Sequence, residues 1–279
     1  MTTSRFGWGA AVACAFAVSA ALSVPAIADG GGYRSGNGGG YANGNGNGEE
    51  TYSTVVVSGA DMTERANEMY SGVYYALNRN LDSDGFIVRI LGSRGYYDYD
   101  AFGGFVQIDS NYWQGDVMID YQVVRGGLDI AAYIGVDYQD YNLSFPGDPS
   151  NPLQGSEVGF KAAFDLESNG STNSPWYYAL RGSYSTAFDQ YYALARIGHK
   201  VGRFTVGPEA WALGDESGDA ERLGAFIAWD VSLGRGTTGN ISFSVGHQFS
   251  DGDDGGFAGG GRQFDDGTYG SVKFWLAFN

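Results

Sequence analysis

The chain has 279 residues and a formal net charge of -16, and it contains 46 Gly, 20 Tyr, 17 Phe and a single Cys. One Cys excludes a disulfide scaffold, a charged fraction of 17% excludes a coiled coil, and the acidic balance excludes a typical nucleic-acid-binding surface, which is basic. Because 43% of the residues are apolar, the chain can form a core, and its many Gly and aromatic residues are typical of an all-β protein.

Residues 1–28 have the composition of an export signal. Arg5 supplies a positive charge, residues 7–24 are apolar and rich in Ala, and residues 26–28 (Ala-Ile-Ala) form the small-x-small pattern that precedes a cleavage site. We therefore expect a signal peptide cleaved after Ala28, with an uncleaved anchor as the alternative. No run of eighteen apolar residues follows, so the sequence predicts no membrane-spanning helix after the signal.

Two different patterns follow the signal. Residues 29–51 are of low complexity and rich in Gly and Asn, which predicts a flexible linker. From residue 52 onward, apolar and polar residues alternate with a period of two, which predicts β-strands. The clearest segments have ten or more residues. This is long for a soluble sheet and matches the roughly 9–11 residues that a tilted strand needs to cross a bilayer.

Turn residues divide this region into about twelve strands, an even number that lets both ends of a barrel meet on its periplasmic side. The expected strands lie near residues 52–60, 67–78, 85–97, 112–124, 127–141, 154–166, 176–187, 190–200, 204–214, 221–232, 240–249 and 268–278. Most connections alternate between short and long, as periplasmic turns and external loops do, and the longest expected ones are 98–111, 142–153 and 250–267. The connections 168–175 and 188–189 depart from this alternation.

We therefore predict an all-β fold: an antiparallel transmembrane β-barrel of the outer-membrane type, with about twelve strands, over residues 52–279. The alternative is a soluble sandwich or a lipocalin-like barrel, in which the apolar face points inward. A period of two does not distinguish these orientations. Strand length and the sparse charge of the apolar face favour the membrane barrel. So does the last strand, which has Phe274, Leu276 and Phe278 on one face, although the terminal Asn279 departs from an ideal ending in Phe.

If the apolar face meets lipid, the polar face lines the lumen. The residues assigned to that face are Arg89, Asp116, Asp120, Asp129, Asp137, Glu157, Lys161, Asp165, Arg181, Arg196, Glu209, Arg222, Asp230 and Lys273, with the aromatic residues Tyr133, Trp211 and Trp275. One interpretation is an ion-pair network that stiffens or plugs the barrel. The other is a polar channel for a neutral, hydroxyl-rich solute, in which aromatic rings stack on sugars and charged groups bind their hydroxyls.

Further aromatic residues lie near the ends of the expected strands. They are Trp113, Tyr138, Tyr141, Tyr184 and Trp229. Because Tyr and Trp are enriched where a barrel meets the two membrane interfaces, we expect these residues to form aromatic girdles.

Catalytic and metal sites are not evident. The two histidines, His199 and His247, have only Ile, Val and Phe as same-face neighbours along their strands, so neither has an adjacent Ser nucleophile. Residues 80–85 match the first half of an EF-hand loop, but Leu91 stands at the twelfth position in place of Glu. We interpret this stretch, like the acidic residues 251–254, as a solvated turn. We expect no enzyme activity, no metal and no other cofactor.

Four segments carry a family resemblance: residues 70–95 (YSGVYYALNRNLDSDGFIVRILGSRG), 185–195, 202–219 (GRFTVGPEAWALGDESGD) and 270–278 (GSVKFWLAF). Through them the region 52–279 resembles the alphaproteobacterial cellulose biosynthesis protein BcsS. The resemblance implies an exported β-barrel that assists cellulose production or export, and it supplies no catalytic residues.

This resemblance draws attention to Glu209, Trp211, Asp215 and Glu216. The alternation places Glu209, Trp211 and Asp215 on the lumen face near the external mouth, where carboxylates beside a Trp would hold a glucan chain. The alternative is a strand end capped by a solvated acidic turn.

The alternation predicts an outer-membrane barrel, and the resemblance implies that it serves bacterial cellulose biosynthesis or export as a non-catalytic accessory. Its expected partners are outer-membrane lipid, a β-glucan (cellulose) chain and components of the cellulose synthase complex, but no nucleic acid. Two alternatives stay open: a general oligosaccharide or small-solute channel, and a structural surface barrel with a plugged lumen.

Overall fold

The computed structural model describes residues 51–101, 105–144, 148, 151–169, 174–234, 237–250 and 265–278. Within them the chain forms twelve strands: β1 (Thr54–Met62), β2 (Ala66–Ala76), β3 (Gly85–Ala101), β4 (Val106–Arg125), β5 (Leu128–Leu143), β6 (Gly155–Ser168), β7 (Trp176–Ser185), β8 (Tyr191–Val201), β9 (Phe204–Asp215), β10 (Gly218–Gly234), β11 (Thr237–Ser250) and β12 (Gly267–Phe278). The expected signal peptide and nearly all of the expected linker lie outside the described residues.

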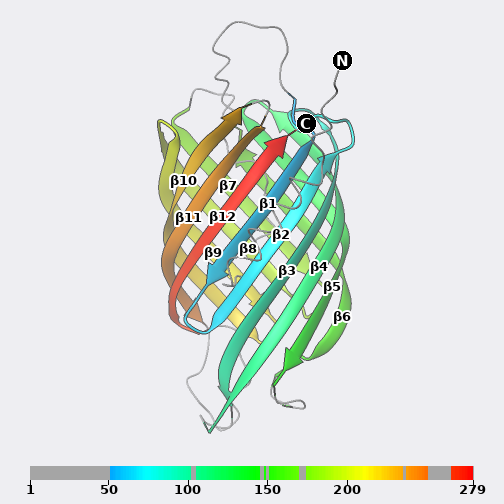
Figure 1. Cartoon of the computed structure of the whole chain (residues 1–279), viewed down its shortest axis with the longest axis vertical. Coiled ribbons are helices and arrows are strands. Elements are labelled where there is room, and N and C mark those ends of the chain that lie inside the picture. The colour runs from blue at the N-terminus through cyan, green and yellow to red at the C-terminus, as the bar shows by residue number, and fades with distance from the viewer. Residues whose placement is uncertain are drawn as a thin grey trace, which may run out of the picture.

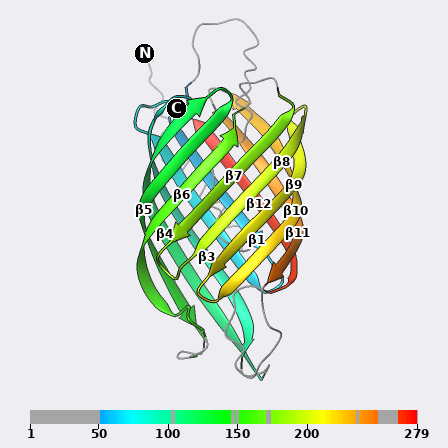
Figure 2. The same ribbon diagram turned by 180° about the vertical axis from the view of Figure 1, so that it is seen from behind.

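The strands form one closed antiparallel barrel (Figures 1 and 2). Each strand pairs with its sequence neighbours, and β1 pairs with β12 through nine residue pairs from Thr54–Phe278 to Met62–Gly270. The all-β barrel of about twelve strands is therefore confirmed. Because Thr54 and Phe278 are paired, both described ends of the chain lie at one end of the barrel, which we call the terminal end.

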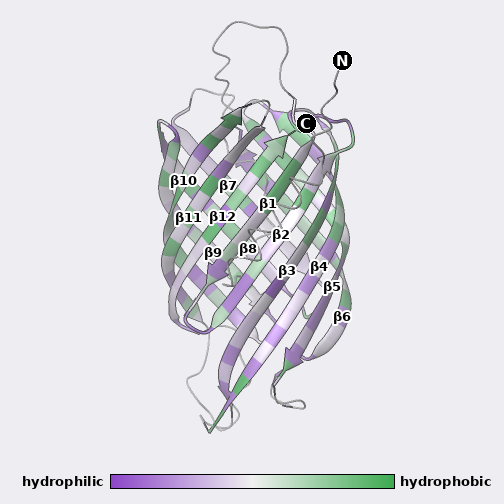
Figure 3. Ribbon diagram, viewed as in Figure 1, coloured by the Kyte–Doolittle hydropathy of each residue, from purple (hydrophilic) through white to green (hydrophobic). Residues whose placement is uncertain are grey.

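The period of two separates an outer from an inner face, and β4 shows this clearly. Val117 and Ile119 are 51% and 43% exposed, whereas Asp116 and Asp120 are 3% and 2% exposed. Figure 3 shows hydrophobic and hydrophilic residues alternating along the strands around the barrel. The apolar side chains point outward and the polar ones inward, which is the outer-membrane arrangement and not the soluble one. No helix in the described part of the chain has the length and hydropathy to span a membrane.

The third connection differs from the prediction. A long loop was expected at 98–111, but β3 and β4 continue to Ala101 and Val106, and residues 102–105 connect them. The Asp-rich stretch keeps the period of two, because Tyr97, Tyr99 and Ala101 point inward and are buried. The β3–β4 hairpin extends beyond its neighbours, since β2 pairs with β3 only as far as Tyr97, and it projects at the lower end of the barrel in Figure 1.

The end opposite the termini, which we call the far mouth, carries the connections β1–β2, β3–β4, β5–β6, β7–β8, β9–β10 and β11–β12. The β7–β8 connection is a short turn of residues 186–190, as the sequence predicted. In it Phe188 and Asp189 both have positive φ, at 52° and 48°. This turn points the Phe188 side chain into the barrel, where it is 2% exposed.

Candidate functional site: the barrel interior and its far mouth

Most residues predicted to line the lumen do point inward. The buried ones are Arg89, Asp116, Asp120, Asp129, Tyr133, Asp137, Lys161, Asp165, Arg181, Arg196, Glu209, Trp211, Asp215, Arg222, Lys273 and Trp275. Glu157 is exposed and Asp230 is half-buried, so these two do not lie in the interior. Both have the inward phase, but Glu157 lies near the start of β6 at the rim of the far mouth, and Asp230 lies near the terminal end, where it accepts a hydrogen bond from Asn240.

Asp116 joins two cations in the interior. Arg89 donates to both Asp116 oxygens, from Nε to Oδ1 at 3.2 Å and from Nη2 to Oδ2 at 3.0 Å. Lys161 Nζ donates to the same Oδ2 at 3.0 Å. The Arg89 guanidinium lies 5.2 Å from the centre of the Tyr133 ring, and Tyr133 donates to Asp165 at 2.9 Å. Five predicted residues are therefore brought together as partners of one another.

Glu209 is the centre of a second network. Its carboxylate accepts hydrogen bonds from Arg196 Nε at 2.7 Å, Tyr269 Oη at 2.7 Å, Ser244 Oγ at 3.0 Å and Trp211 Nε1 at 3.1 Å. Four donors satisfy a buried carboxylate, which otherwise would be costly to desolvate. The Glu209 and Trp211 side chains are therefore engaged with each other and do not face an open lumen.

Two further ion pairs use residues that sequence reasoning did not single out. Arg222 binds Asp61, and Arg181 Nη2 binds Glu167 Oε2 at 2.7 Å. The signal for Glu167 was present, because it has the same phase in β6 as Asp165. Asp61 was missed because the first strand was expected to end at residue 60, whereas β1 continues to Met62.

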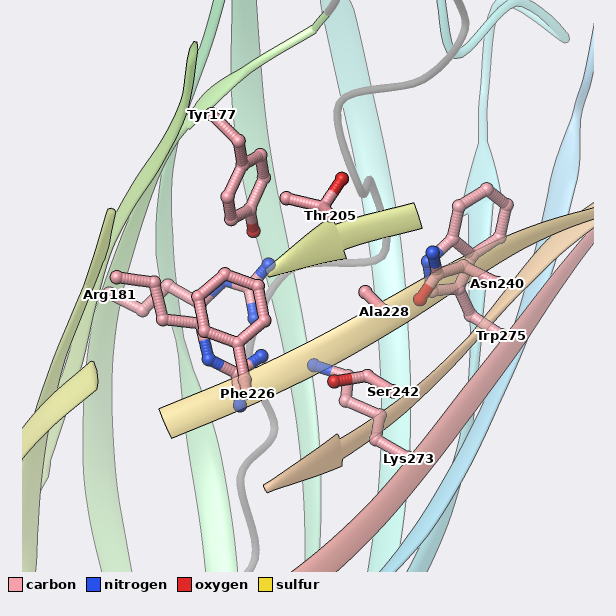
Figure 4. A pocket seen from close by; sticks show the side chains of 10 residues that line it. Tyr177, Arg181, Thr205, Phe226, Ala228, Asn240, Ser242, Lys273 and Trp275 are labelled. Atoms are coloured by element: carbon pink, nitrogen blue, oxygen red, sulfur yellow. The ribbon is translucent and has the colours of Figure 1, made fainter. Parts of the chain in front are cut away.

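Three cations line a small cavity in the interior. Arg181, Arg196 and Lys273 surround it together with Asn240 and Trp275, as Figure 4 shows for most of its lining. The cavity has a volume of about 20 Å³. A single water needs about 10–15 Å³ by this measure, so the cavity is far too small for a sugar ring.

An aromatic cluster is buried inside the barrel near the far mouth. The Tyr141 ring stacks on Tyr112 with centroids 5.0 Å apart, and the Phe188 ring meets Tyr141 at 4.9 Å and 78°. Tyr97 and Tyr99 continue the cluster, with centroids 6.1 Å apart. We call these five residues the mouth cluster. Tyr141 was expected in an outer girdle, but it is 2% exposed because it has the inward phase of Asp137 and Gln139.

The other girdle residues point outward. Trp113, Tyr184 and Trp229 are exposed, and Tyr138 is half-buried against Trp113, with ring centroids 4.7 Å apart. A half-exposed ring near a strand end suits a membrane interface.

Residues of the β5–β6 connection pack on the mouth cluster. Leu153 is buried in it, Asp148 accepts a hydrogen bond from Tyr99 Oη at 2.7 Å, and Asn151 donates to Tyr97 Oη at 3.1 Å. The expected long loop at 142–153 thus contributes a cover to the interior.

Asp215 and Glu216 form an acidic turn at the same end. Asp215 accepts hydrogen bonds from Ser217 N at 2.8 Å and Ser217 Oγ at 2.6 Å, which caps the end of β9. Glu216 donates its backbone N–H to Phe188 O at 3.0 Å. Burial, and then the charges of Glu157 and Asp189, raise the pKa of the Glu216 carboxyl. The hydrogen bonds of Asp215 are those of a capped strand end, but its side chain is buried and not solvated as that interpretation expected.

Both histidines lie on the outer face of the barrel. His199 contacts the Trp176 ring at 5.1 Å, and His247 contacts the Phe249 ring at 4.7 Å. Within the described residues, no group of three or more His, Cys, Asp or Glu side chains has the placement to hold a metal ion.

Comparison with solved structures gives distant barrels. The transport unit of the autotransporter AIDA-I from Escherichia coli is 11% identical, with 89% of this chain and 100% of that chain covered, at a TM-score of 0.47. The beta domain of the Bordetella autotransporter Brka is 13% identical, with coverages of 82% and 100%, at 0.43. The KdgM porin in complex with disordered oligogalacturonate is 9% identical, with coverages of 81% and 98%, at 0.40. These values carry no functional argument for this chain.

The sequence itself is more informative. Among curated proteins none matches it. The family model of the cellulose biosynthesis protein BcsS, however, matches residues 55–278, which is the whole barrel except its first residue, Thr54. The chain therefore belongs to the cellulose biosynthesis protein BcsS family.

Proposed function

We propose that this protein is a non-catalytic accessory of cellulose biosynthesis that resides in the outer membrane and acts through binding at its far mouth and outer loops. Family membership supports the link to cellulose biosynthesis. The filled interior is the observation that supports the mode of action. Its largest fully buried side chains include Arg89, Arg222, Tyr133 and Tyr269, all on inward-facing positions of different strands.

The outer surface supports residence in a membrane. Large apolar side chains are exposed on nearly every strand, among them Ile90 at 57%, Ile134 at 57%, Phe160 at 59% and Val245 at 60%. A soluble monomer rarely exposes so continuous an apolar surface, whereas a bilayer requires one. In this orientation the terminal end faces the periplasm and the far mouth faces the exterior.

The contacts of the polar groups support the absence of catalysis. Glu209, Asp116 and Glu167 are each bound by an Arg, and the histidines lie on the lipid-facing surface. A nucleophilic site needs a Ser or similar group bonded to a base that a third group orients. We expect the purified, refolded barrel to lack esterase, lipase and glucanase activity.

Deletion of the gene tests the accessory role. The deletion strain is expected to display less surface cellulose, and expression of the full chain is expected to restore it. A variant that folds into the membrane but has its far-mouth connections replaced by those of an unrelated barrel should not restore surface cellulose. Normal surface cellulose in the deletion strain contradicts the proposal.

A conduit for glucan is the second candidate, because the interior is lined by polar groups of both signs. Planar-bilayer recordings separate the two candidates. The filled interior predicts no stable porin-like conductance of the wild-type barrel, with or without cello-oligosaccharides. A stable open channel that cello-oligosaccharides block favours the conduit.

A further inference from the structure

The β7–β8 turn has a strained backbone that its sequence does not explain. Phe188 and Asp189 both adopt the left-handed region, with φ of 52° and 48°. This conformation is ordinary for Gly and unfavourable for a bulky residue such as Phe. Residues held in it need support from their surroundings, and they are concentrated at ligand clamps and switch regions.

The surroundings that hold this turn are the inner face of β5 and the rim of the far mouth. The Phe188 ring is buried against Tyr141, 4.9 Å between centroids. The Phe188 N–H donates to Glu157 Oε2 at 3.1 Å, and the Phe188 carbonyl accepts from Glu216 N at 3.0 Å. The turn is therefore bound as a ligand would be, through one apolar ring and several hydrogen bonds.

Polar groups of β5 also contact the turn. We call Asp137, Gln139 and Tyr141 of β5 the seat of the turn. Gln139 Nε2 donates to the Ala187 carbonyl at 3.3 Å and approaches Gln190 Oε1 at 3.3 Å. Asp137 Oδ1 accepts from Ser185 Oγ at 2.8 Å. Gln139 Nε2 also donates to Asp137 Oδ2 at 2.9 Å, and Ser185 belongs to β7, so Asp137 keeps its partners if the turn moves away. Gln139 is fully buried and would lose its bonds to Ala187 and Gln190, which another ligand would have to replace.

Aromatic rings beside amide and carboxylate groups are also the chemistry that recognises a sugar. A pyranose presents an apolar face that packs on an aromatic ring, and its hydroxyls both donate and accept hydrogen bonds. In the seat, Tyr141 offers the ring, and Gln139 and Asp137 offer the polar groups. Phe188 covers the ring, and the Ala187 and Gln190 oxygens occupy Gln139.

We propose that the far mouth holds a binding site for a neutral β-glucan end, and that the chain's own β7–β8 turn occupies this site in the structure described. The inference rests on the proposed function, since family membership supplies the glucan. A sugar ring would take the place of the Phe188 ring on Tyr141, and its hydroxyls would replace the Ala187 and Gln190 oxygens. The turn would then move outward and relax its backbone.

The rim explains why the ligand is neutral. Glu157 and Glu216 each bond to the backbone of Phe188, and both lie near Asp189 of the turn, so the rim here is negatively charged. Such a rim repels an anionic polysaccharide and leaves a neutral one unaffected. The turn competes with the sugar, so only molecules in which the turn has left the site can bind. The apparent Kd of the wild-type barrel is therefore the intrinsic Kd divided by the fraction of such molecules.

Calorimetric titration of the refolded full chain with cellohexaose tests the site. Phe188→Ala removes the competing ring and is expected to bind about tenfold more tightly than the wild type. Adding Tyr141→Ala to this variant is expected to abolish the gain, and hexagalacturonate is expected not to bind. The matched control is Phe160→Ala on the outer face, where the ring is 59% exposed, and it should leave affinity unchanged.

Hydrogen exchange on the wild-type barrel gives a test that needs no variant. Cellohexaose is expected to speed exchange of the amides in residues 186–190, because it displaces the turn, whereas a ligand bound elsewhere would slow exchange or leave it unchanged. Unchanged exchange, or equal affinity of Phe188→Ala and wild type, overturns the site. If the deletion strain displays less cellulose but the barrel does not bind cellohexaose, the binding site is wrong and the accessory role stands. If the barrel binds cellohexaose but the deletion strain displays normal cellulose, the accessory role is wrong and the binding site stands.

Discussion

Arg222 of β10 binds Asp61 of β1 across the two strands that lie between them, with Nη1 2.9 Å from Oδ1 and 3.0 Å from Oδ2. Both side chains are buried, at 2% and 7% exposure. Arg222 also donates from Nε to Gln248 at 2.8 Å and lies 4.9 Å from the Tyr269 ring centre. The ion pair links the first strand to β10 within the barrel interior. It lies next to the junction at which backbone hydrogen bonds between β1 and β12 close the barrel.

Removing one partner of this pair should be costly. Arg222→Ala leaves the Asp61 carboxylate buried without its cation, and such losses typically amount to about 3–5 kcal/mol of the free energy of unfolding. Urea unfolding of the barrel in phospholipid vesicles measures it. The double variant Arg222→Met with Asp61→Leu should recover most of the loss, because no buried charge remains. Equal stability of the single and double variants contradicts this account.

Gly95 is required by a neighbouring ring. A Cβ at this inward position would overlap the Tyr112 side chain, which is itself fixed by stacking on Tyr141. Gly95→Ala is therefore expected to destabilise the barrel by about 1–3 kcal/mol. Gly92→Ala on the outer face is the control, since its Cβ would meet only Gln114 O, at an ordinary 3.7 Å. If both variants unfold at the same urea concentration, contact with Tyr112 is not the reason for a glycine at position 95.

Lipid contact on the outer face predicts a dependence on depth. Ile134, in the middle of β5, is 57% exposed, and Leu233, at the terminal end of β10, is 64% exposed. Arg at the bilayer midplane costs about 2–4 kcal/mol, and near an interface about 0–1 kcal/mol. Ile134→Arg should thus lower the stability in vesicles far more than Leu233→Arg does. A soluble barrel would tolerate both equally.

Acid should weaken the β2–β3 turn. Asp84 in this turn accepts hydrogen bonds from Arg125 Nη1 and Nη2, each at 2.7 Å, and from Val124 N at 2.9 Å. The Arg125 hydrogen bond and then that of Val124 lower the pKa of Asp84. The ionised carboxyl therefore stabilises the fold above its unfolded pKa of about 3.9, and this stabilisation is lost as the pH falls through the lower folded value.

The temperature of the heat-induced gel-mobility shift, recorded from neutral to strongly acid pH, measures this effect. Asp84→Asn and Arg125→Gln should each flatten the decline below about pH 4, because either change removes the ion pair whose loss produces it. A wild-type decline that both variants retain in full would have to come from other carboxyls.

Local pattern predicted the faces of the barrel well. Asp116, Asp120 and Val117 have the burial that their phase in the strand implied, because alternate side chains of a strand point to opposite faces whatever the strand pairs with. The same rule identifies the misplaced residue, since Tyr141 has the phase of the polar face and was assigned by its position near a strand end. The prediction of a loop at 98–111 was wrong for a related reason. Its Asp residues indicated a loop, although they alternate with Tyr residues that point inward.

Pairing within the interior was not predictable from one strand at a time. Glu209 of β9 accepts from Tyr269 of β12 and from Ser244 of β11, which lie near it only because the barrel is closed and curved. Nothing in the sequence indicated that Phe188 would be buried in the barrel. A Phe at the tip of a short turn is expected in solvent, and its burial depends on two left-handed backbone positions and on the β5 surface that receives it.

Alternation along the chain thus predicted about twelve strands, each with one apolar and one polar face, because a period of two is a local property that each strand carries alone. That the apolar face points outward follows from the burial of the polar side chains in the closed barrel. Only the folded barrel shows which charges neutralise one another, that the interior is filled, and that the β7–β8 turn buries Phe188 at the far mouth. These features depend on distances between side chains from different strands, and curvature and register fix those distances only when all twelve strands have closed.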